Sequence, residues 1–490
     1  MRLSAGVLYK LHRPSTCELR VYLWGQGVKE AEPGPYEKVI EQLGIFHEGR
    51  HLKSLGEFVN LAGGTEDERV ARTIDAVKSQ ATIIYQGTFK RELNVGGKTV
   101  TLIGQPDFLL RSGEGYLIRD AKLSRRITDK DHPEILGQVR LYGLLFEKTF
   151  GRKPVRLEVF AGSGELVEVP YVAEQALMEA LSEIADLLNL REAPFSPVGW
   201  TKCGQCGYRN NCWDAAVEAR DVGLVPLVDQ GMTKALRIVG VATASEFLEK
   251  FNESSLAEFK RPWGKSERKV GALAPKILTL ARALNSGKQE LLAKPEIPDA
   301  RNYVMFDLEG LPPQLDELDK IYLWGFQVFG EHPGPFEGVL AGMGTNGDRE
   351  GWENFLRRVG TLFDSYGDIP FVHWHHYEKT YLGRYSERYG DSDGIAERVK
   401  ANLLDLLPVT LRAVALPISS YSLKVVEKYV GFNRTQDEYG GDWAMAKFIE
   451  ATETEDSNTR QEIMEQILKY NQEDLQATWA VFQWLRKLGG

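Results

Sequence analysis

Two strand-like segments of this chain each carry a pair of charged residues separated by one position. The pairs are Asp120 and Lys122 in GYLIRDAKL, and Asp307 and Glu309 in NYVMFDLEG. Because alternate residues of a strand point to the same face, each pair places two charges on one side of a sheet. Short alternating segments and helical patterns flank both pairs, so two mixed α/β folds are predicted.

The length of 490 residues and the apolar content of 43% allow two or three independent cores. No run approaches the roughly 18 uninterrupted apolar residues that a membrane helix needs. The N-terminus also lacks a long apolar stretch that ends in a small-residue cleavage site. We therefore expect a soluble, cytoplasmic protein without a membrane partner.

The formal net charge of −9 argues against a surface coated with cations for gripping nucleic acid. It leaves room for a local basic channel, and the cation-rich segment 119–130, RDAKLSRRITDK, is one candidate. A solvated charged face is the alternative for that segment, and charge alone favours it.

The pattern along the chain predicts three regions. They are a mixed α/β region at 1–216, a helical region at 217–299 and a second α/β region at 300–490. In the helical region, Gly240 ends one short helix, and Thr243 with Glu246 forms a capping box for the next. This pair resembles the helix–hairpin–helix units that hold DNA backbones through main-chain amides, with a plain helical spacer as the alternative. Two prolines mark 285–300 as a linker.

A set of charged residues in the first region has the composition that phosphodiester hydrolysis needs. Asp107, in GQPD, is predicted to arrive from the strand next to Asp120 and Lys122. The two carboxylates would bind Mg or Mn, which neutralises charge developing on the phosphate and lowers the pKa of bound water. Lys122 would position or polarise the attacking water.

Two further motifs accompany this set. Gln138 and Tyr142 are four residues apart on a predicted helix, so they share a face and are placed to contact the DNA backbone or the lysine. His47, in GIFHE, is a predicted further metal ligand, with a capping or packing role as the alternative. A lone D-x-K pair is weak evidence, whereas its ordered combination with these motifs is specific.

These ordered motifs resemble the RecB-type PD-(D/E)XK nucleases, which have a restriction-endonuclease-like fold. The cysteine spacing is similar to that of the branch with a cysteine-ligated iron–sulfur cluster, which includes CRISPR-associated exonucleases. The resemblance covers roughly residues 1–216. It implies that His47, Asp107 and Asp120 hold the metal ion and that Lys122 assists the attack of water on DNA.

The chain has four cysteines, and each has a place in this resemblance. They are Cys17, Cys203, Cys206 and Cys212. In a reducing compartment a structural disulfide is not expected, so ligation of a metal or cluster is the better interpretation. The resemblance implies a 4Fe-4S cluster that joins the cysteine before the nuclease core to the three after it. Four thiolates also bind zinc, which stays the alternative.

The third region carries a second set of acidic motifs. Besides Asp307 and Glu309, Tyr470 and Asp474 lie four positions apart in YNQED, on one helical face. With the segment SSYSLK between them, these motifs resemble DnaQ-like, YprB-type 3′-5′ exonucleases of the ribonuclease-H fold. The resemblance covers residues 300–490. Such enzymes hold two metal ions with four carboxylates.

The resemblance assigns three of the four carboxylates directly, to Asp307, Glu309 and Asp474. The middle motif normally has an aspartate after an aromatic residue, but here the chain reads HWHHYE, so Glu378 would take that place with a side chain one methylene longer. Asp405, in NLLDLLP, is expected to have a structural role or to support the metal ligands from behind, with metal binding as the alternative if Glu378 does not take part. Activity of the second site therefore depends on Glu378.

Together the motifs predict a metal-dependent nuclease that hydrolyses single-stranded DNA, with a second domain that trims or binds 3′ ends. RNA or an RNA–DNA hybrid is the alternative substrate. A further alternative is a non-catalytic scaffold that holds nucleic acid for a partner such as a helicase or a repair protein.

Overall fold

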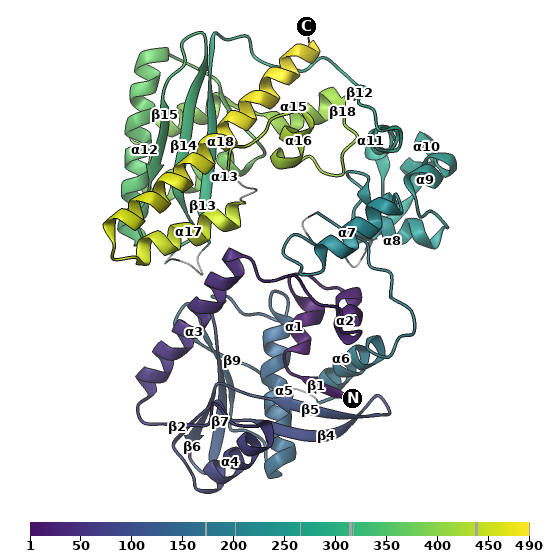
Figure 1. Cartoon of the computed structure of the whole chain (residues 1–490), viewed down its shortest axis with the longest axis vertical. Coiled ribbons are helices and arrows are strands. Elements are labelled where there is room, and N and C mark those ends of the chain that lie inside the picture. Colours follow the sequence, from purple (N-terminus) through teal and green to yellow (C-terminus); the bar gives the residue numbers. More distant parts are fainter. Residues whose placement is uncertain are drawn as a thin grey trace. The chain divides into compact units, whose positions relative to one another are not determined.

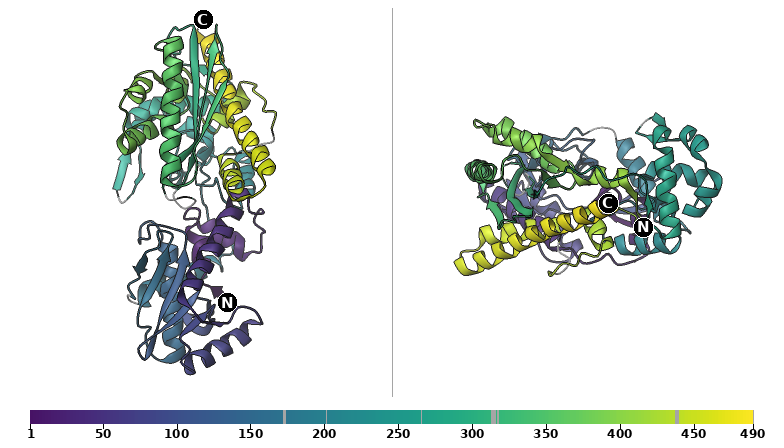
Figure 2. Two further views of the ribbon diagram at one scale, coloured as in Figure 1. Left: turned by 90° about the vertical axis from the view of Figure 1, so that its left-hand side faces the viewer. Right: turned by 90° about the horizontal axis from the view of Figure 1, so that it is seen from above.

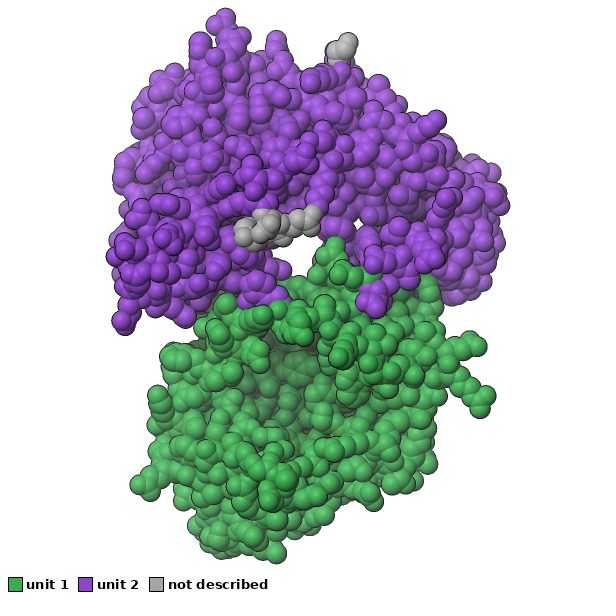
Figure 3. All heavy atoms as spheres, in the orientation of Figure 1, with its two compact units in different colours: residues 1–33, 37–196, 201–210 green, residues 34–36, 197–200, 211–490 purple. Residues whose placement is uncertain are grey.

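The computed structural model describes residues 1–171, 174–200, 202–264, 266–312, 316, 318–436 and 440–489. They form two compact units, coloured separately in Figure 3. The first comprises residues 1–33, 37–196 and 201–210, and the second comprises residues 34–36, 197–200 and 211–490. Within the described ranges, no helix has both the length and the apolar character needed to cross a membrane.

A six-stranded sheet forms the centre of the first unit, in the order β2-β3-β6-β7-β8-β9 (Figure 1). Its strands are β2 (Val59–Asn60), β3 (Ile83–Tyr85), β6 (Phe108–Ser112), β7 (Gly115–Lys122), β8 (Leu157–Ala161) and β9 (Leu166–Glu168). Strands β6 and β7 are antiparallel, whereas β7 and β8 are parallel. The sheet is therefore mixed, as predicted.

A smaller sheet has the order β1-β5-β4. Its strands are β1 (Arg2–Ser4), β4 (Phe89–Val95) and β5 (Lys98–Gly104). Helix α5 (Pro133–Phe150) contacts strands of both sheets. This helix starts with a proline, which suits the first turn, and ends at Gly151 in the left-handed region at φ 70°.

The remaining helices of the first region surround these sheets. They are α1 (Val7–His12), α2 (Glu18–Gly25), α3 (Pro35–Leu55), α4 (Glu66–Lys78) and α6 (Glu174–Leu187). Buried apolar side chains of α1, α4, α5 and α6 join those of the strands in one hydrophobic core.

The second unit is built on a five-stranded sheet in the order β15-β14-β13-β16-β17. Its strands are β13 (Asn302–Leu311), β14 (Lys320–Gly330), β15 (Phe336–Leu340), β16 (Phe371–His373) and β17 (Leu403–Asp405). Strand β13 pairs antiparallel with β14 and parallel with β16. Its helices are α12 (Gly344–Tyr366), α13 (Tyr377–Tyr389), α14 (Ile395–Ala401), α15 (Leu406–Ala413), α16 (Leu423–Tyr429), α17 (Gly441–Glu453) and α18 (Ser457–Gly489).

Helices α12 and α18 cover opposite faces of this sheet (Figure 2). Val304 and Phe306 of β13 belong to the core that includes α12, whereas Tyr303 and Met305 belong to the core that includes α18. Alternate residues of β13 therefore face opposite layers. Asp307 continues the odd-numbered series, which places it on the α18 side.

The part of the sequence that follows the first unit's sheets and precedes β13 forms short helices and one hairpin. Its elements are α7 (Arg209–Glu218), α8 (Gln230–Ile238), α9 (Ala244–Lys250), α10 (Glu253–Glu258), β10 (Lys260–Trp263), β11 (Ser266–Lys269) and α11 (Ala274–Ser286). Gly240, at φ 78°, separates α8 from α9, and the predicted Thr243–Glu246 capping box is present. The hairpin of β10 and β11 was not predicted, because this region was interpreted as helical.

This region shares one hydrophobic core with the five-stranded sheet. Phe247 and Ile277, from the short helices, belong to the same cluster as Tyr303 and Leu475. Within the predicted linker at 285–300, strand β12 (Glu290–Leu291) pairs with β18 (Val414–Ala415). The helical region therefore folds against the sheet of the second unit.

Candidate active sites

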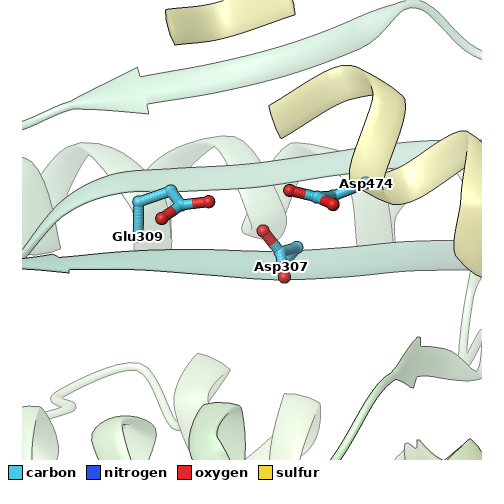
Figure 4. Close-up of side chains that lie close together, drawn as sticks. All are labelled: Asp307, Glu309 and Asp474. Carbon is cyan, nitrogen blue, oxygen red and sulfur yellow. The ribbon is translucent and has the colours of Figure 1, made fainter. Parts of the chain in front are cut away.

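Three carboxylates meet on the α18 side of the second unit (Figure 4). Asp307 and Glu309 come from β13 and Asp474 comes from α18, and one oxygen of each lies within 4.8 Å of the others. Among the described residues, no other group of three metal-ligating side chains meets this criterion. Carboxylate oxygens are the ligands that Mg prefers, so the donor set fits a hard divalent ion.

The electrostatics of this group also favour a cation. Burial and the charge of Asp474 raise the pKa of Asp307 well above its usual value. The same two causes raise the pKa of Glu309 to about 8. Several carboxylates in one buried place repel one another when ionised, and a divalent cation relieves that repulsion.

Asn471 holds Asp307 in place, although sequence reasoning did not single it out. Its Nδ2 donates to Oδ2 of Asp307 at 2.7 Å, and the side chain is fully buried. Asn471 precedes Asp474 by three positions in α18, so a shared helical face was the available signal. Gly325 of β14 pairs with Asp307 and has no side chain, so it leaves room for Asn471. A Cβ at Gly325 would lie 1.7 Å from Oδ1 of Asn471.

A partly buried arginine, Arg434, supports Asp474. Nε and Nη2 of Arg434 lie 2.7 and 2.8 Å from the two carboxylate oxygens of Glu427, and Nη2 also donates to Asp474. Tyr470 is buried beside this group, and burial followed by the Asp474 charge raises its pKa well above the usual value. Lys424 lies 5.2 Å from the centroid of the Tyr470 ring.

Glu378 lies at the start of α13, near enough to the same carboxylates for its charge to act on them. Its Oε2 is 3.0 Å from Nδ1 of His373, and both side chains are buried. Its charge contributes to the raised pKa of Asp307, although it is outside the group whose oxygens meet within 4.8 Å. Asp405 caps α15, since Oδ1 accepts from the backbone N of Leu407 at 3.0 Å and of His375 at 2.9 Å.

The structure brings Asp107, Asp120 and Lys122 together in the first unit. Nζ of Lys122 lies 2.7 Å from Oδ2 of Asp120, and the backbone N of Asp107 donates to Oδ1 of Asp120 at 3.3 Å. Burial and the Asp120 charge raise the pKa of Asp107 well above its usual value. Burial alone would lower the pKa of Lys122, but the Asp120 carboxylate raises it well above its usual value.

Gln138 and Tyr142 lie beside this set on α5. Nε2 of Gln138 donates to the Tyr142 hydroxyl at 2.6 Å. Burial, followed by the Asp120 charge, raises the pKa of Tyr142 well above its usual value. The ring packs against Gly104 of β5, where a Cβ would lie 2.7 Å from Cδ1 of Tyr142.

His47 lies away from these carboxylates, and its neighbour Glu48 lies beside them. The His47 ring stacks on Phe160 at 4.7 Å, and its Nε2 is 3.3 Å from the Phe160 carbonyl oxygen. Nε2 of Gln86 donates to Oε1 of Glu48 at 2.7 Å and to Oδ1 of Asp107 at 3.1 Å. The motif GIFHE is visible in the sequence, but the rotation of α3 about its axis is not. That rotation decides whether His47 or Glu48 lies on the side of Asp107.

The four cysteines are half-buried and form no disulfide. Cys17, Cys203 and Cys206 belong to the first unit, and Cys212 lies on α7. Among the described residues of the first unit, the sulfurs of Cys17, Cys203 and Cys206 do not all lie within 4.8 Å of one another. Four thiolates on one zinc ion, each at about 2.3 Å, would lie closer together than that. The donor set of four thiolates still has the composition that an iron–sulfur cluster needs.

Two family models match the chain at the positions of these sites. The model described as the PD-(D/E)XK nuclease superfamily matches residues 37–213, and the one described as the RNase_H superfamily matches residues 304–486. The chain contains a PD-(D/E)XK nuclease superfamily domain and an RNase H superfamily domain. The predicted fold class is thereby confirmed.

The PD-(D/E)XK domain includes the Asp107 set, and the RNase H domain includes the Asp307 set. Nuclease domains of these superfamilies usually use Mg or Mn and bind nucleic acid. No curated protein matches the chain. A solved structure titled "Crystal structure of SSO0001" aligns at 17% identity, with a TM-score of 0.21, over 36% of this chain and 96% of that one.

Proposed function

We propose that this protein is a metal-dependent nuclease that hydrolyses single-stranded DNA in its PD-(D/E)XK domain and trims 3′ ends in its RNase H domain. The proposal is carried by the convergence of Asp307, Glu309 and Asp474 inside a domain of a nuclease superfamily. Mg or Mn held there would neutralise charge on the phosphate and lower the pKa of the attacking water.

The residues around the second site have separate tasks in this proposal. Asn471 holds Asp307 through its amide, and Arg434 holds Asp474 through its guanidinium. Glu378 would supply the fourth carboxylate, and its hydrogen bond with His373 fixes its direction. Tyr470 would orient the water or the scissile phosphate.

In the first site, Asp107 and Asp120 would hold the metal ion, with Glu48 linked to Asp107 through Gln86. Lys122 would position the attacking water from its place beside Asp120. His47 stays a predicted ligand that would need a change of side-chain position to join them. The Gln138–Tyr142 pair would contact the DNA strand bound next to this site.

The test compares the parent protein with Asp107→Asn, Asp307→Asn and the double variant. Each is incubated with Mn and 5′-labelled or 3′-labelled single strands of DNA and of RNA. We expect Asp307→Asn to abolish stepwise loss of 3′ nucleotides, Asp107→Asn to abolish the other products, and the double variant to be inactive. Cleavage by the double variant at the parent's rate would refute both assignments.

The same experiment decides between the alternatives. Cleavage of RNA in preference to DNA would make RNA the substrate. A parent protein that binds both strands but cleaves neither would act as a scaffold for a partner such as a helicase. Cytoplasmic location fits either case and is part of the proposal.

We further propose that Cys17, Cys203, Cys206 and Cys212 hold a 4Fe-4S cluster that joins the two ends of the first domain. The support is the donor set of four cysteines and their spacing around the PD-(D/E)XK motifs. Protein purified without oxygen should be brown and contain about four iron atoms, and Cys17→Ser should lose both properties. A colourless protein with one zinc ion would contradict the cluster.

A further inference from the structure

The hairpin of β10 and β11 is unusually basic and has no task in either proposed active site. Its sequence, KRPWGKSERK at 260–269, has five lysine or arginine residues and one glutamate in a chain whose net charge is −9. The two strands pair antiparallel, with Arg261 opposite Arg268 and Trp263 opposite Ser266. Residues two apart share a face, so Trp263 and both arginines lie on one side of the hairpin.

An exposed indole occupies the centre of this face. Trp263 is 51% exposed. The guanidinium carbons of Arg261 and Arg268 lie 4.8 and 5.3 Å from the centroid of its ring. The face therefore combines an aromatic surface with two cations.

The base of the hairpin is anchored to α8. Arg261 is buried and forms an ion pair with Asp229, the residue that caps this helix. Gly231 of α8 allows the hairpin backbone to approach closely, since a Cβ at Gly231 would lie 3.1 Å from the Pro262 carbonyl oxygen. The hairpin is thus held in place without using the exposed indole.

The remaining cations differ in whether a carboxylate neutralises them. Lys269 lies 2.5 Å from Glu258, and Lys260 lies 3.9 Å from Glu267. Within the described ranges, Arg268 has no carboxylate partner, and it is exposed on the same face as Trp263. Among the described cations of the hairpin, the one without a carboxylate partner therefore lies next to the exposed ring.

We propose that this hairpin binds a single strand of nucleic acid outside both active sites, with a base stacked on Trp263 and a phosphate paired with Arg268. Bases stack on aromatic rings regardless of sequence, and arginine pairs with phosphate. The choice of nucleic acid as occupant rests on the proposed nuclease function. Because the rest of the chain is negatively charged, a polyanion is attracted to this basic hairpin more than to the remaining surface.

The experiment measures the Kd of the full chain for fluorescein-labelled oligothymidylate by anisotropy, in EDTA so that no metal-dependent cleavage occurs. Loss of a stacked base should raise the Kd of Trp263→Ala at least about fivefold. Arg268→Ala should lower the slope of log K against log salt by about 0.7, the value for one phosphate contact on a single strand. Labelled oligouridylate should respond in the same way.

Two control variants match these changes elsewhere in the chain. Trp24→Ala removes another exposed tryptophan, and Arg349→Ala removes an arginine that lies 5.0 Å from the centroid of the Tyr389 ring. Both should bind the oligonucleotide as the parent does. Equal thermal midpoints for all four variants would show that none of them disturbs the fold.

Parent-like Kd values for Trp263→Ala and Arg268→Ala would overturn the proposal, even if Mn-dependent cleavage by the parent supports the nuclease function. Weakened binding by both variants with no cleavage by the parent would keep the hairpin and remove the nuclease. If Trp263→Ala abolished sedimentation with vesicles of anionic phospholipid but left oligonucleotide binding intact, the occupant would be a lipid surface and the proposal would be wrong.

Discussion

Gly325 lies opposite Asn471, and the amide of Asn471 fills the space that a Cβ on Gly325 would occupy. Because Asn471 donates to Asp307, a methyl group at Gly325 should push the amide away and release the carboxylate. We expect Gly325→Ala to reduce trimming of 3′ ends by roughly 10- to 100-fold, as loss of a partner to a metal ligand does.

Trimming would be followed on 3′-labelled DNA in an Asp107→Asn background. Gly383→Ala is the control, because a Cβ at that position of α13 meets nothing within 4 Å. Equal trimming by the two alanine variants would show that Asn471 does not hold Asp307 for catalysis.

The ion pair between Arg434 and the buried Glu427 should contribute to folding as well as to the site. Arg434→Ala leaves the Glu427 carboxylate buried without its partner, so we expect a loss of about 3–5 kcal/mol in the free energy of unfolding. The double variant with Glu427→Ala should lose less than the two single variants together. Urea unfolding checks this, and strictly additive losses would mean that the pair is not coupled.

We predict that the activity of the second site depends on Glu378. Glu378→Gln keeps the shape of the side chain but removes its charge, so we expect Mn-dependent trimming to fall by roughly 10- to 100-fold. Glu387→Gln, on the exposed side of the same helix, should have no effect. Parent-like trimming by Glu378→Gln would remove Glu378 from the set of metal ligands.

His51 should make the first unit sensitive to acid. Burial, and then the neighbouring Arg119 guanidinium, lowers its pKa from 6.5 to about 4. The unfolded chain thus takes up a proton on His51 below pH 6.5, whereas the folded chain does so only near pH 4. Stability should therefore fall as the pH drops through this window, by about 3 kcal/mol.

His51→Gln should flatten that decline, and the difference from the parent separates His51 from other titrating groups. Hydrogen exchange in β7 and β8 reports on the first unit specifically. His332→Gln, at an exposed histidine of the second unit, should decline as the parent does. An identical decline in His51→Gln would assign the effect to other groups.

Local periodicity predicted the parts of both sites that lie on one element. Asp307 and Glu309 share a face because strands repeat every two residues, and Tyr470 and Asp474 share a face because helices repeat every 3.6. The structure shows both relationships directly. Spacing along one element is therefore sufficient to place residues that act together from that element.

Other parts depend on contacts between distant segments and could not be predicted. The position of Asn471 requires a glycine on β14, and the place of Glu48 beside Asp107 requires a particular rotation of α3. The β10–β11 hairpin lacks the apolar alternation of a half-buried strand, because ion pairs rather than apolar packing hold Arg261 and Lys269. Its sequence consequently gave no strand signal.

The helical region and the five-stranded sheet share one core, and this has a consequence for product length. Trp263 and Asp307 belong to the same compact unit, and the helices next to the hairpin share a core with the sheet that carries Asp307. A strand held by the hairpin would span a set number of nucleotides before its 3′ end reached the carboxylates. Trimming would then slow once the remaining strand became shorter than that span, which would make the second unit a molecular ruler.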